Sequence, residues 1–204
     1  SLVKSDLVWI AESDDWCETN FLESLVPEFY DRDVKLAFCQ SVIAGPQGEI
    51  YAQDYTGYTD DISKTRWLSH YSVSSREEVA VALSQKNTIP NASAVVFRRP
   101  ELSGVTPSLL KYRLCGDWWF YLWRIQDGKI SFIPKPLNYH RRHPKTVTHN
   151  IEKDTRSIEE ALLVKAELFE REDIPYKSIC RSLAFTMYEY NRLSRLHRLN
   201  RPEL

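Results

Sequence analysis

Three carboxylates fall within four residues near the start of the chain. Glu12, Asp14 and Asp15 follow the apolar run 6–11 in the stretch WIAESDDW. Charges of one sign repel at this spacing, whereas three carboxylates together can hold a hard divalent cation such as Mg²⁺ or Mn²⁺. Such a site leaves coordination positions open for diphosphate oxygens and water. A cation site is the prediction, and the alternative is that the acids only favour the positive end of a following helix.

A fourth acid, Asp117, is flanked by tryptophans in the stretch LCGDWWFYLWR. Gly116 allows a tight turn, and Trp118 and Trp119 offer flat apolar faces on which a sugar ring can stack. Partial burial beside these rings would raise the pKa of the carboxyl and make it a more effective general base. The alternative is a helix-capping aspartate with core tryptophans behind it.

A basic segment, residues 139–150, carries Arg141, Arg142, Lys145 and three histidines. Arginine and lysine bind phosphate by charge and by hydrogen bonds, and histidine can complete a metal site. We therefore expect this segment to approach a diphosphate. A solvated basic loop is the alternative, because the histidine spacing is not that of a zinc site.

A second basic segment, residues 191–202, places arginines three residues apart beside leucines. A basic amphipathic helix of this kind can lie on an anionic membrane surface, as a peripheral contact. The alternative, a solvated helix end packed on its own domain, is the one we favour.

The elements that must position these residues alternate between strand and helix before a helical tail. The continuous apolar run 6–11 is typical of a buried parallel strand, which would place the acids at the ligand-binding carboxyl edge of an open α/β sheet. Residues 51–72 lack a clear period and predict a long loop with short helical pieces, of the kind that is usually functional or mobile. The other expected strands are 34–44, 91–99 and 129–134, and the expected helices are 18–33, 75–83, 116–126, 157–172 and 176–199.

Local signals predict the ends and faces of these helices. Ser75 with Glu78 and Ser157 with Glu160 have the spacing of a capping box, and Thr19 or Asn20 is expected to cap the first helix. The residues expected to face the core are Phe21, Leu22, Leu25 and Val26; Ile158, Leu162 and Phe169; and Ile179, Leu183, Met187 and Tyr190.

Composition narrows the class of protein. The chain has 204 residues, 43% of them hydrophobic, which is enough for a packed core, and a net charge of −1 predicts no overall attraction to nucleic acid. Four widely separated cysteines indicate buried free thiols in a reducing compartment. With no 18-residue apolar run and no signal-peptide pattern, a cytoplasmic location is expected, with the inner face of the membrane as an alternative.

Taken in order, these sites resemble the family 2 glycosyltransferases, a large inverting group with the GT-A fold. The matching stretches are VWIAESDDWCETNFLESLV, NTIPNASAVVFRR and CGDWWFYLWRIQDGKISFIPKPLNYHRRHPKTVT, which cover most of residues 6–148. The resemblance implies transfer of a sugar from a nucleotide-diphosphate sugar to a hydroxyl of a saccharide or lipid-linked acceptor. It also implies a Mn²⁺ or Mg²⁺ cofactor and a place in cell-surface polysaccharide or glycoconjugate synthesis.

On the donor side, the resemblance puts Glu12 and Asp14 in the two acidic places of a D-x-D motif, with glutamate in place of the first aspartate. Asp15 follows directly, and Asp14 and Asp15 are the first choice as metal ligands. The late basic segment that approaches the diphosphate matches Arg141, Arg142 and His143.

On the acceptor side, Asp117 matches the general base that takes the proton of the acceptor hydroxyl. Asn91 and Ser93 lie in the strand that lines the acceptor side in this family, and Trp118 and Trp119 are the expected sugar-stacking residues.

The chain departs from the family at its start, with eleven residues before the acidic motif where family members have about a hundred. We therefore expect residues 1–150 to be the C-terminal half of a GT-A domain, a partial α/β mixed sheet flanked by helices, with the nucleotide-binding half missing. Residues 151–204 would be a helical extension. The open sheet edge would then be covered by the missing half, a second copy of the chain or the helical tail, and the chain alone would be inactive.

Two other functions compete with this one. A non-catalytic carbohydrate-binding module would keep the aromatic residues and need no metal. A metal-dependent phosphoryl-transfer or hydrolytic enzyme would use the same carboxylates and release phosphate without needing an acceptor.

Overall fold

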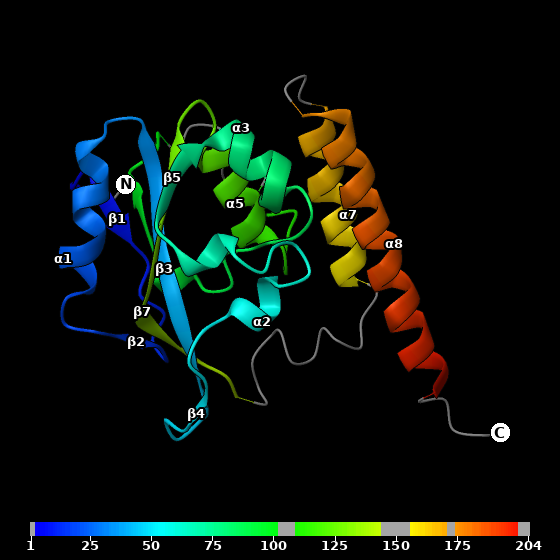
Figure 1. The fold of residues 1–204 in the computed structure, drawn as a ribbon, viewed down its shortest axis with the longest axis horizontal. Coiled ribbons are helices and arrows are strands. Elements are labelled where there is room, and N and C mark those ends of the chain that lie inside the picture. Colours follow the sequence, from blue (N-terminus) through cyan, green and yellow to red (C-terminus); the bar gives the residue numbers. More distant parts are fainter. Residues whose placement is uncertain (1–2, 102–108, 144–155, 171–173, 200–204) are drawn as a thin grey trace.

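The computed structural model describes residues 3–101, 109–143, 156–170 and 174–199. Figure 1 shows a sheet with one short helical layer on one side and several helices on the other. The strands are β1 (Leu7–Trp9), β2 (Trp16–Cys17), β3 (Val34–Ala44), β4 (Ile50–Ala52), β5 (Tyr71–Ser74), β6 (Val95–Arg98) and β7 (Lys129–Arg141). The helices are α1 (Phe21–Leu25), η1 (Val26–Tyr30), α2 (Thr56–Thr59), η2 (Arg66–Leu68), α3 (Ser75–Glu78), η3 (Val79–Leu83), η4 (Ala92–Ala94), α5 (Gly116–Arg124), α7 (Arg156–Phe169) and α8 (Tyr176–Leu199).

The sheet is mixed and is built around two long strands. Its main order is β1-β6-β3-β7-β2, with β4 paired to β3 and β5 paired to β7. Strand β3 runs parallel to β7 and antiparallel to β6. The prediction of an α/β mixed sheet flanked by helices, with a helical C-terminal segment, is confirmed.

Alternate residues of β3 face two separate cores, as the two-residue period of a strand requires. Leu36 and Phe38 pack with α5, η3 and α7 on one face. Ala37 and Cys39 pack with Phe21 and other residues of α1 and η1 on the opposite face. The helical tail belongs to the first core, because α7 contributes Val164 and Leu168 to it. The expected domain boundary at residue 150 lies outside the described residues.

The first strand differs from its prediction. β1 pairs antiparallel with β6, and its three residues are only half-buried. Within the described part of the chain β1 ends the sheet order, so it has one strand neighbour instead of two. A continuous apolar run therefore did not identify a buried parallel strand in this case.

The first two helices also differ in detail. The helix expected over 18–33 is shorter, because α1 gives way at Val26 to a 3₁₀ turn that contains Pro27. Leu22 and Val26, expected in the core, are 44% and 38% exposed.

The expected caps of the helices are displaced or absent. Asn20 occupies the cap position of α1, but its side chain makes no capping hydrogen bond. Ser74, not Ser75, caps α3 by accepting from the backbone N–H of Glu77. Glu78 is fully buried and paired with Arg66 at 2.5 Å, so it does not complete a capping box.

The long helix α8 has the predicted bounds but buries a different face. Leu183 and Met187 are 48% and 61% exposed, whereas Ser178, Ser182 and Thr186 are buried. The hydroxyl of Ser178 donates to the carbonyl of Ala80 at 2.8 Å, and that of Ser182 donates to the carbonyl of Ser84. These carbonyls lie in and just after the π-helical turn η3, where intrahelical bonding is incomplete. The polar face of α8 therefore packs inward because it satisfies backbone groups there.

Two further findings concern membrane-spanning helices and the state of the cysteines. None of the helices among the described residues is both long and apolar enough to cross a membrane. All four cysteines are free: Cys39 is buried, Cys17 and Cys115 are half-buried, and Cys180 is exposed.

Candidate functional site

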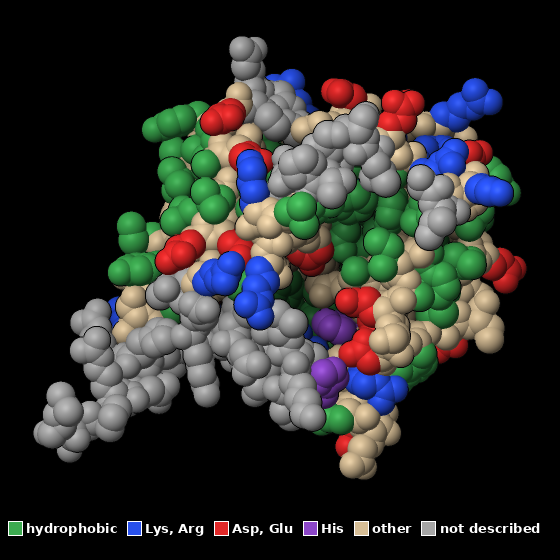
Figure 2. Space-filling model, turned by 180° about the vertical axis from the view of Figure 1, so that it is seen from behind, with side chains coloured by type: hydrophobic (Ala, Val, Ile, Leu, Met, Phe, Trp, Pro, Cys, Tyr) green, Lys and Arg blue, Asp and Glu red, His purple; other side chains and the backbone are tan. Residues whose placement is uncertain are grey.

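The structure brings all four predicted acids around one cavity, which we call the acidic hollow. It has a volume of about 480 Å³ and opens on a face where acidic and histidine side chains gather (Figure 2). Four segments meet there: the turn after β1, residues 90–92 at the start of η4, the start of α5 and the end of β7. Its polar lining consists of Glu12, Asp14, Asp15, Asn91, Arg113, Asp117, His140, Arg141 and His143.

Asp15 anchors the acidic turn to the rest of the protein. One of its carboxylate oxygens accepts from Asn91 Nδ2 at 2.9 Å, and the other accepts from the backbone N–H of Arg141 at 2.8 Å. The backbone N–H of Glu12 donates to Ser93 Oγ at 3.0 Å. The turn is therefore held on both sides, and both Asp15 oxygens have protein partners.

Asn91 and Ser93, predicted on the acceptor side, are buried behind the acids. Asn91 lines the acidic hollow but uses its amide to bond both Asp15 and Asn138, the latter at 2.7 Å. Ser93 supports the turn through Glu12. In this structure both residues position the acids.

Of the predicted site residues, Asp14 and His143 come closest to forming a pair of metal ligands. Asp14 Oδ2 lies 3.2 Å from His143 Nε2, and the two residues come from segments 129 positions apart. The described residues contain no group of three or more His, Cys, Asp or Glu side chains placed to hold a metal. One or two carboxylates are nevertheless enough for Mg²⁺ when substrate phosphates complete its coordination, so Asp14 and Glu12, which line the same hollow, fit a cation that binds together with a diphosphate.

The two predicted arginines lie in different surroundings. The guanidinium of Arg141 donates at 2.7 Å to the carbonyls of Asp14 and Pro46, and it lies 4.7 Å from the centre of the Trp16 ring. Arg142 lines a neighbouring cavity of about 560 Å³, which we call the Tyr55 hollow. Arg141 is thus committed to backbone carbonyls, whereas Arg142 faces a cavity.

Asp117 lies where the two hollows meet. It lines both of them, as do Pro90 and Leu114. Its oxygens accept from the backbone N–H of Trp118 at 2.7 Å and from Asn87 Nδ2 at 3.0 Å. Asp117 is exposed to solvent, but the protein packed around its carboxyl displaces part of its water and raises its pKa to about 6, and these hydrogen bonds oppose the rise.

The neighbouring titratable groups respond to the same surroundings. Burial, and then the charges of Asp15, Asp14 and Asp117, raise the pKa of Glu12. Burial also lowers the pKa of His140, and its Nδ1 lies 2.5 Å from the hydroxyl of Tyr55. Two carboxyls with a raised pKa, Glu12 and Asp117, beside an imidazole with a lowered pKa are typical of functional sites.

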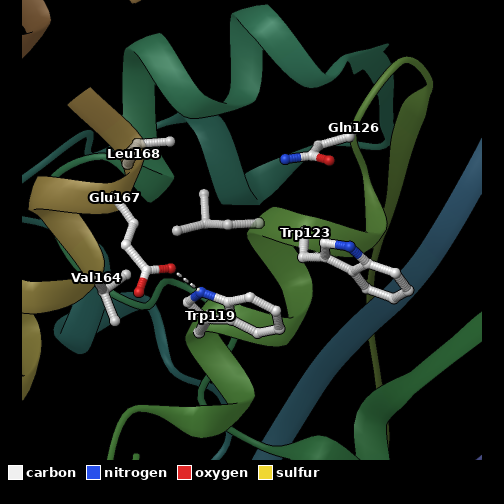
Figure 3. A pocket seen from close by; sticks show the side chains of 7 residues that line it. Trp119, Trp123, Gln126, Val164, Glu167 and Leu168 are labelled. Atoms are coloured by element: carbon white, nitrogen blue, oxygen red, sulfur yellow. Dashed lines mark hydrogen bonds between the residues drawn. The ribbon is translucent and has the colours of Figure 1, made fainter. Parts of the chain in front are cut away.

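The two tryptophans after Asp117 point to different places. Trp118 is 3% exposed, donates through Nε1 to the carbonyl of Leu83 at 2.9 Å, and lines the Tyr55 hollow. Trp119 instead points toward α7, where its Nε1 donates to Glu167 at 2.6 Å (Figure 3). It lines a separate cavity of about 120 Å³ with Trp123, so it does not face Asp117.

Sequence patterns missed three residues around Asp117. Asn87 holds its carboxylate, and Tyr55 and Tyr58 line the Tyr55 hollow. The tyrosines lie in the loop 51–72, whose length was the available signal, while nothing local marked Asn87.

Lys145 and His149, and the side chains of Arg198 and Arg201, lie outside what the structure describes.

Comparison with known proteins does not identify the chain. No protein-family model matches it, and none of the curated proteins searched matches it.

Proposed function

We propose that the chain carries the acceptor and cation side of an inverting glycosyltransferase, which moves a sugar from a nucleotide-diphosphate sugar to an acceptor hydroxyl. The observation that supports this most is the position of Asp117, a solvent-exposed side chain that shares one hollow with three further acids and His143; the surrounding protein raises the pKa of its carboxyl to about 6. A group with this pKa is ionised at neutral pH yet basic enough to take a proton from a polarised hydroxyl.

On the acceptor side, Asp117 is the general base. Each of its oxygens accepts one hydrogen bond from the protein and keeps a lone pair for the acceptor hydroxyl. The proton moves to Asp117 as the acceptor oxygen bonds to the anomeric carbon. The bond from that carbon to the diphosphate breaks on the opposite face, and its electron pair leaves with the diphosphate, which inverts the centre.

The saccharide or lipid-linked acceptor would occupy the Tyr55 hollow, whose lining combines Tyr55, Tyr58 and Trp118 with the amide of Asn87. Aromatic faces beside a few polar groups suit a sugar.

On the donor side, Asp14 and His143 would hold the cation, Mn²⁺ or Mg²⁺, with Glu12 close by. When bound, the cation offsets the charge that develops on the leaving diphosphate. Asp15 fixes the turn that carries Asp14, because both of its oxygens bond to Asn91 and Arg141. Of the two arginines, Arg142 would meet a phosphate from the side of the Tyr55 hollow that it lines, because the guanidinium of Arg141 is already bonded to backbone carbonyls.

The test is sugar-nucleotide turnover across a panel of donors, with Mn²⁺ and with chelator. It is run on this chain and on any longer protein that contains it. Asp14→Asn and Asp117→Asn should abolish release of nucleoside diphosphate, while Asp60→Asn and Asp127→Asn, at exposed positions, should leave it unchanged. Absence of turnover from both folded forms with every donor would reject the proposal.

The second candidate is a non-catalytic carbohydrate-binding module. Trp119 and Trp123 favour it, because their rings are parallel to within 5° with centres 6.3 Å apart beside Glu167 (Figure 3). It predicts saccharide binding that neither chelator nor Asp117→Asn changes, because the cavity that these tryptophans line is separate from Asp117.

For the location, we propose the cytoplasm, with the inner face of the membrane as the alternative. The free state of Cys39 and the other cysteines suits a reducing compartment.

A further inference from the structure

A third cavity, which we call the Lys165 hollow, lies between α5 and the pair α7–α8. Its volume is about 200 Å³. It is lined by three cationic side chains, those of Lys86, Lys165 and Arg192, together with the aromatic rings of Trp118 and Phe185.

Lys165 is buried without an anionic partner. The residue is 2% exposed, and its Nζ donates to the carbonyl of Ser182 at 3.1 Å and to Thr186 Oγ1 at 2.6 Å. Both acceptors are neutral, and among the described residues no carboxylate lies within ion-pair distance of it. An ammonium has three N–H donors, so one remains for a further acceptor.

The buried Glu78 and the other cations of this hollow have ionic partners. Glu78, fully buried, pairs with Arg66 at 2.5 Å. Within the Lys165 hollow itself, Lys86 pairs with Asp61 at 2.8 Å and Arg192 with Glu189 at 2.8 Å. Lys165 therefore differs from its neighbours, and burying an unpaired charge is costly.

The aromatic rings compensate the charge only in part. Lys165 Nζ lies 5.8 Å from the centre of the Trp118 ring and 5.6 Å from that of Phe185, and Lys86 Nζ lies 5.3 Å from the same Phe185 ring. These distances are at the long end for cation–π contacts. Two ammonium groups thus flank one ring at the wall of a cavity.

We propose that the Lys165 hollow is a binding site for a phosphate-sized oxyanion. The free N–H of Lys165 would donate to the anion, and the positive charges of Lys86 and Arg192 would add to the attraction. The bound anion would supply the negative charge that the fold itself does not place beside Lys165.

The position of the site points to the source of the anion. Trp118 and Ser157 line both this hollow and the Tyr55 hollow that begins at Asp117. If the proposed transferase function holds, on which this step rests, the acceptor is a molecule that carries a phosphate or carboxylate beyond its reacting sugar.

Binding of inorganic phosphate to the full chain, measured by calorimetry against sodium chloride of equal ionic strength, tests the site without any turnover. Wild type should bind phosphate, and Lys165→Met should bind it about tenfold or more weakly because a charge-assisted hydrogen bond is lost. Lys177→Met is the matched control: it removes the same charge from an exposed position at the start of α8 and should bind as wild type does.

Two further arms keep the proposal open to refutation. If Lys165→Met fails to fold, Lys86→Gln replaces it and should also weaken phosphate binding. Hexose 1-phosphate and acetate distinguish a phosphorylated from a carboxylated ligand, and either one binding in a Lys165-dependent way supports the site. Equal binding by wild type and Lys165→Met, or no binding beyond that of chloride, overturns it. Because no donor sugar is used, this result is separate from success or failure of turnover.

Discussion

Glu160 on α7 binds one end of the short segment 113–117 and Asp117 forms its other end, yet their surroundings shift their pKa values in opposite directions. The Glu160 carboxylate, buried on α7, accepts from the backbone N–H groups of Arg113, Leu114 and Cys115 at 2.7–3.1 Å. These bonds, together with Arg156, lower its pKa despite burial. Asp117, two residues after Cys115, has only two donors, and its pKa rises to about 6.

The comparison separates a carboxylate that holds the fold from one that is available for chemistry. Glu160 has its charge fully engaged by the chain leading into α5, so it fixes where that helix begins. Asp117 faces two hollows and keeps acceptor capacity. Both groups are carboxyls, and the balance between desolvation, which raises the pKa, and hydrogen bonds to the charged form, which lower it, decides which way each one shifts.

The largest expected effect is on turnover in Asp117→Asn. An amide cannot take the acceptor proton, so we expect kcat to fall about 10²–10⁴-fold while the chain stays folded. Steady-state kinetics on the turnover-competent protein, with circular dichroism to check the fold, measure it. Activity within twofold of wild type would remove Asp117 from the mechanism.

The converse change is Glu160→Gln, which should act on stability. Replacing one oxygen by an amide leaves buried backbone N–H groups without an acceptor, so the free energy of unfolding should fall by about 1–3 kcal/mol. Urea denaturation measures this loss. Glu159→Gln, next to it and exposed on α7, should change stability little. An equal loss in both variants would contradict the role of Glu160 in holding the backbone of residues 113–115.

The pH dependence of turnover should show whether Asp117 is the carboxyl that acts in catalysis. Because Asp117 must be ionised, kcat/KM should fall about tenfold per pH unit below its pKa of about 6. Asn87→Ala removes a hydrogen bond that lowers this pKa, so the break should move to higher pH. A break that stays in place in Asn87→Ala would assign the titration to another group, such as Glu12.

Much of the fold could be predicted because strong local patterns agreed with the tertiary packing. Strand 34–44 has its exact predicted bounds, since a Gly-Pro turn ends a long run of buried residues. The helix beginning at Gly116 and the bounds of α8 were also predicted correctly.

The faces of helices could not be predicted where backbone groups set the packing. Nothing in the periodicity of α8 shows that Ser178 and Ser182 meet the carbonyls of η3, so the exposed Leu183 and Met187 were expected in the core. The spacing of Ser157 and Glu160 likewise resembles a capping box, but Glu160 serves a loop 45–47 residues away.

In the candidate site, the acids and Asp117 could be recognised by residue type, and they do line one hollow. The residues that hold these acids in place could not be recognised by residue type. Asn91 and Asn87 act through hydrogen bonds to residues 76 and 30 positions away, and short-range spacing carries no such information.

The smallest expected effect is on the pH dependence of stability, where the two carboxyls should again differ in sign. The folded-state pKa of Asp117, about 6, lies above its unfolded value near 3.8, so its contribution to stability declines as pH rises through this window. Asp117→Asn lacks this decline, and its stability relative to wild type should increase between pH 4 and 7. The pKa of Glu160 is lowered, so its contribution is present above the unfolded value near 4.5 and is lost on acidification. The destabilisation by Glu160→Gln should therefore shrink as pH falls. Urea midpoints of both variants and wild type from pH 3 to 8 give these differences directly, and curves that run parallel to wild type would show that neither carboxyl is perturbed by folding.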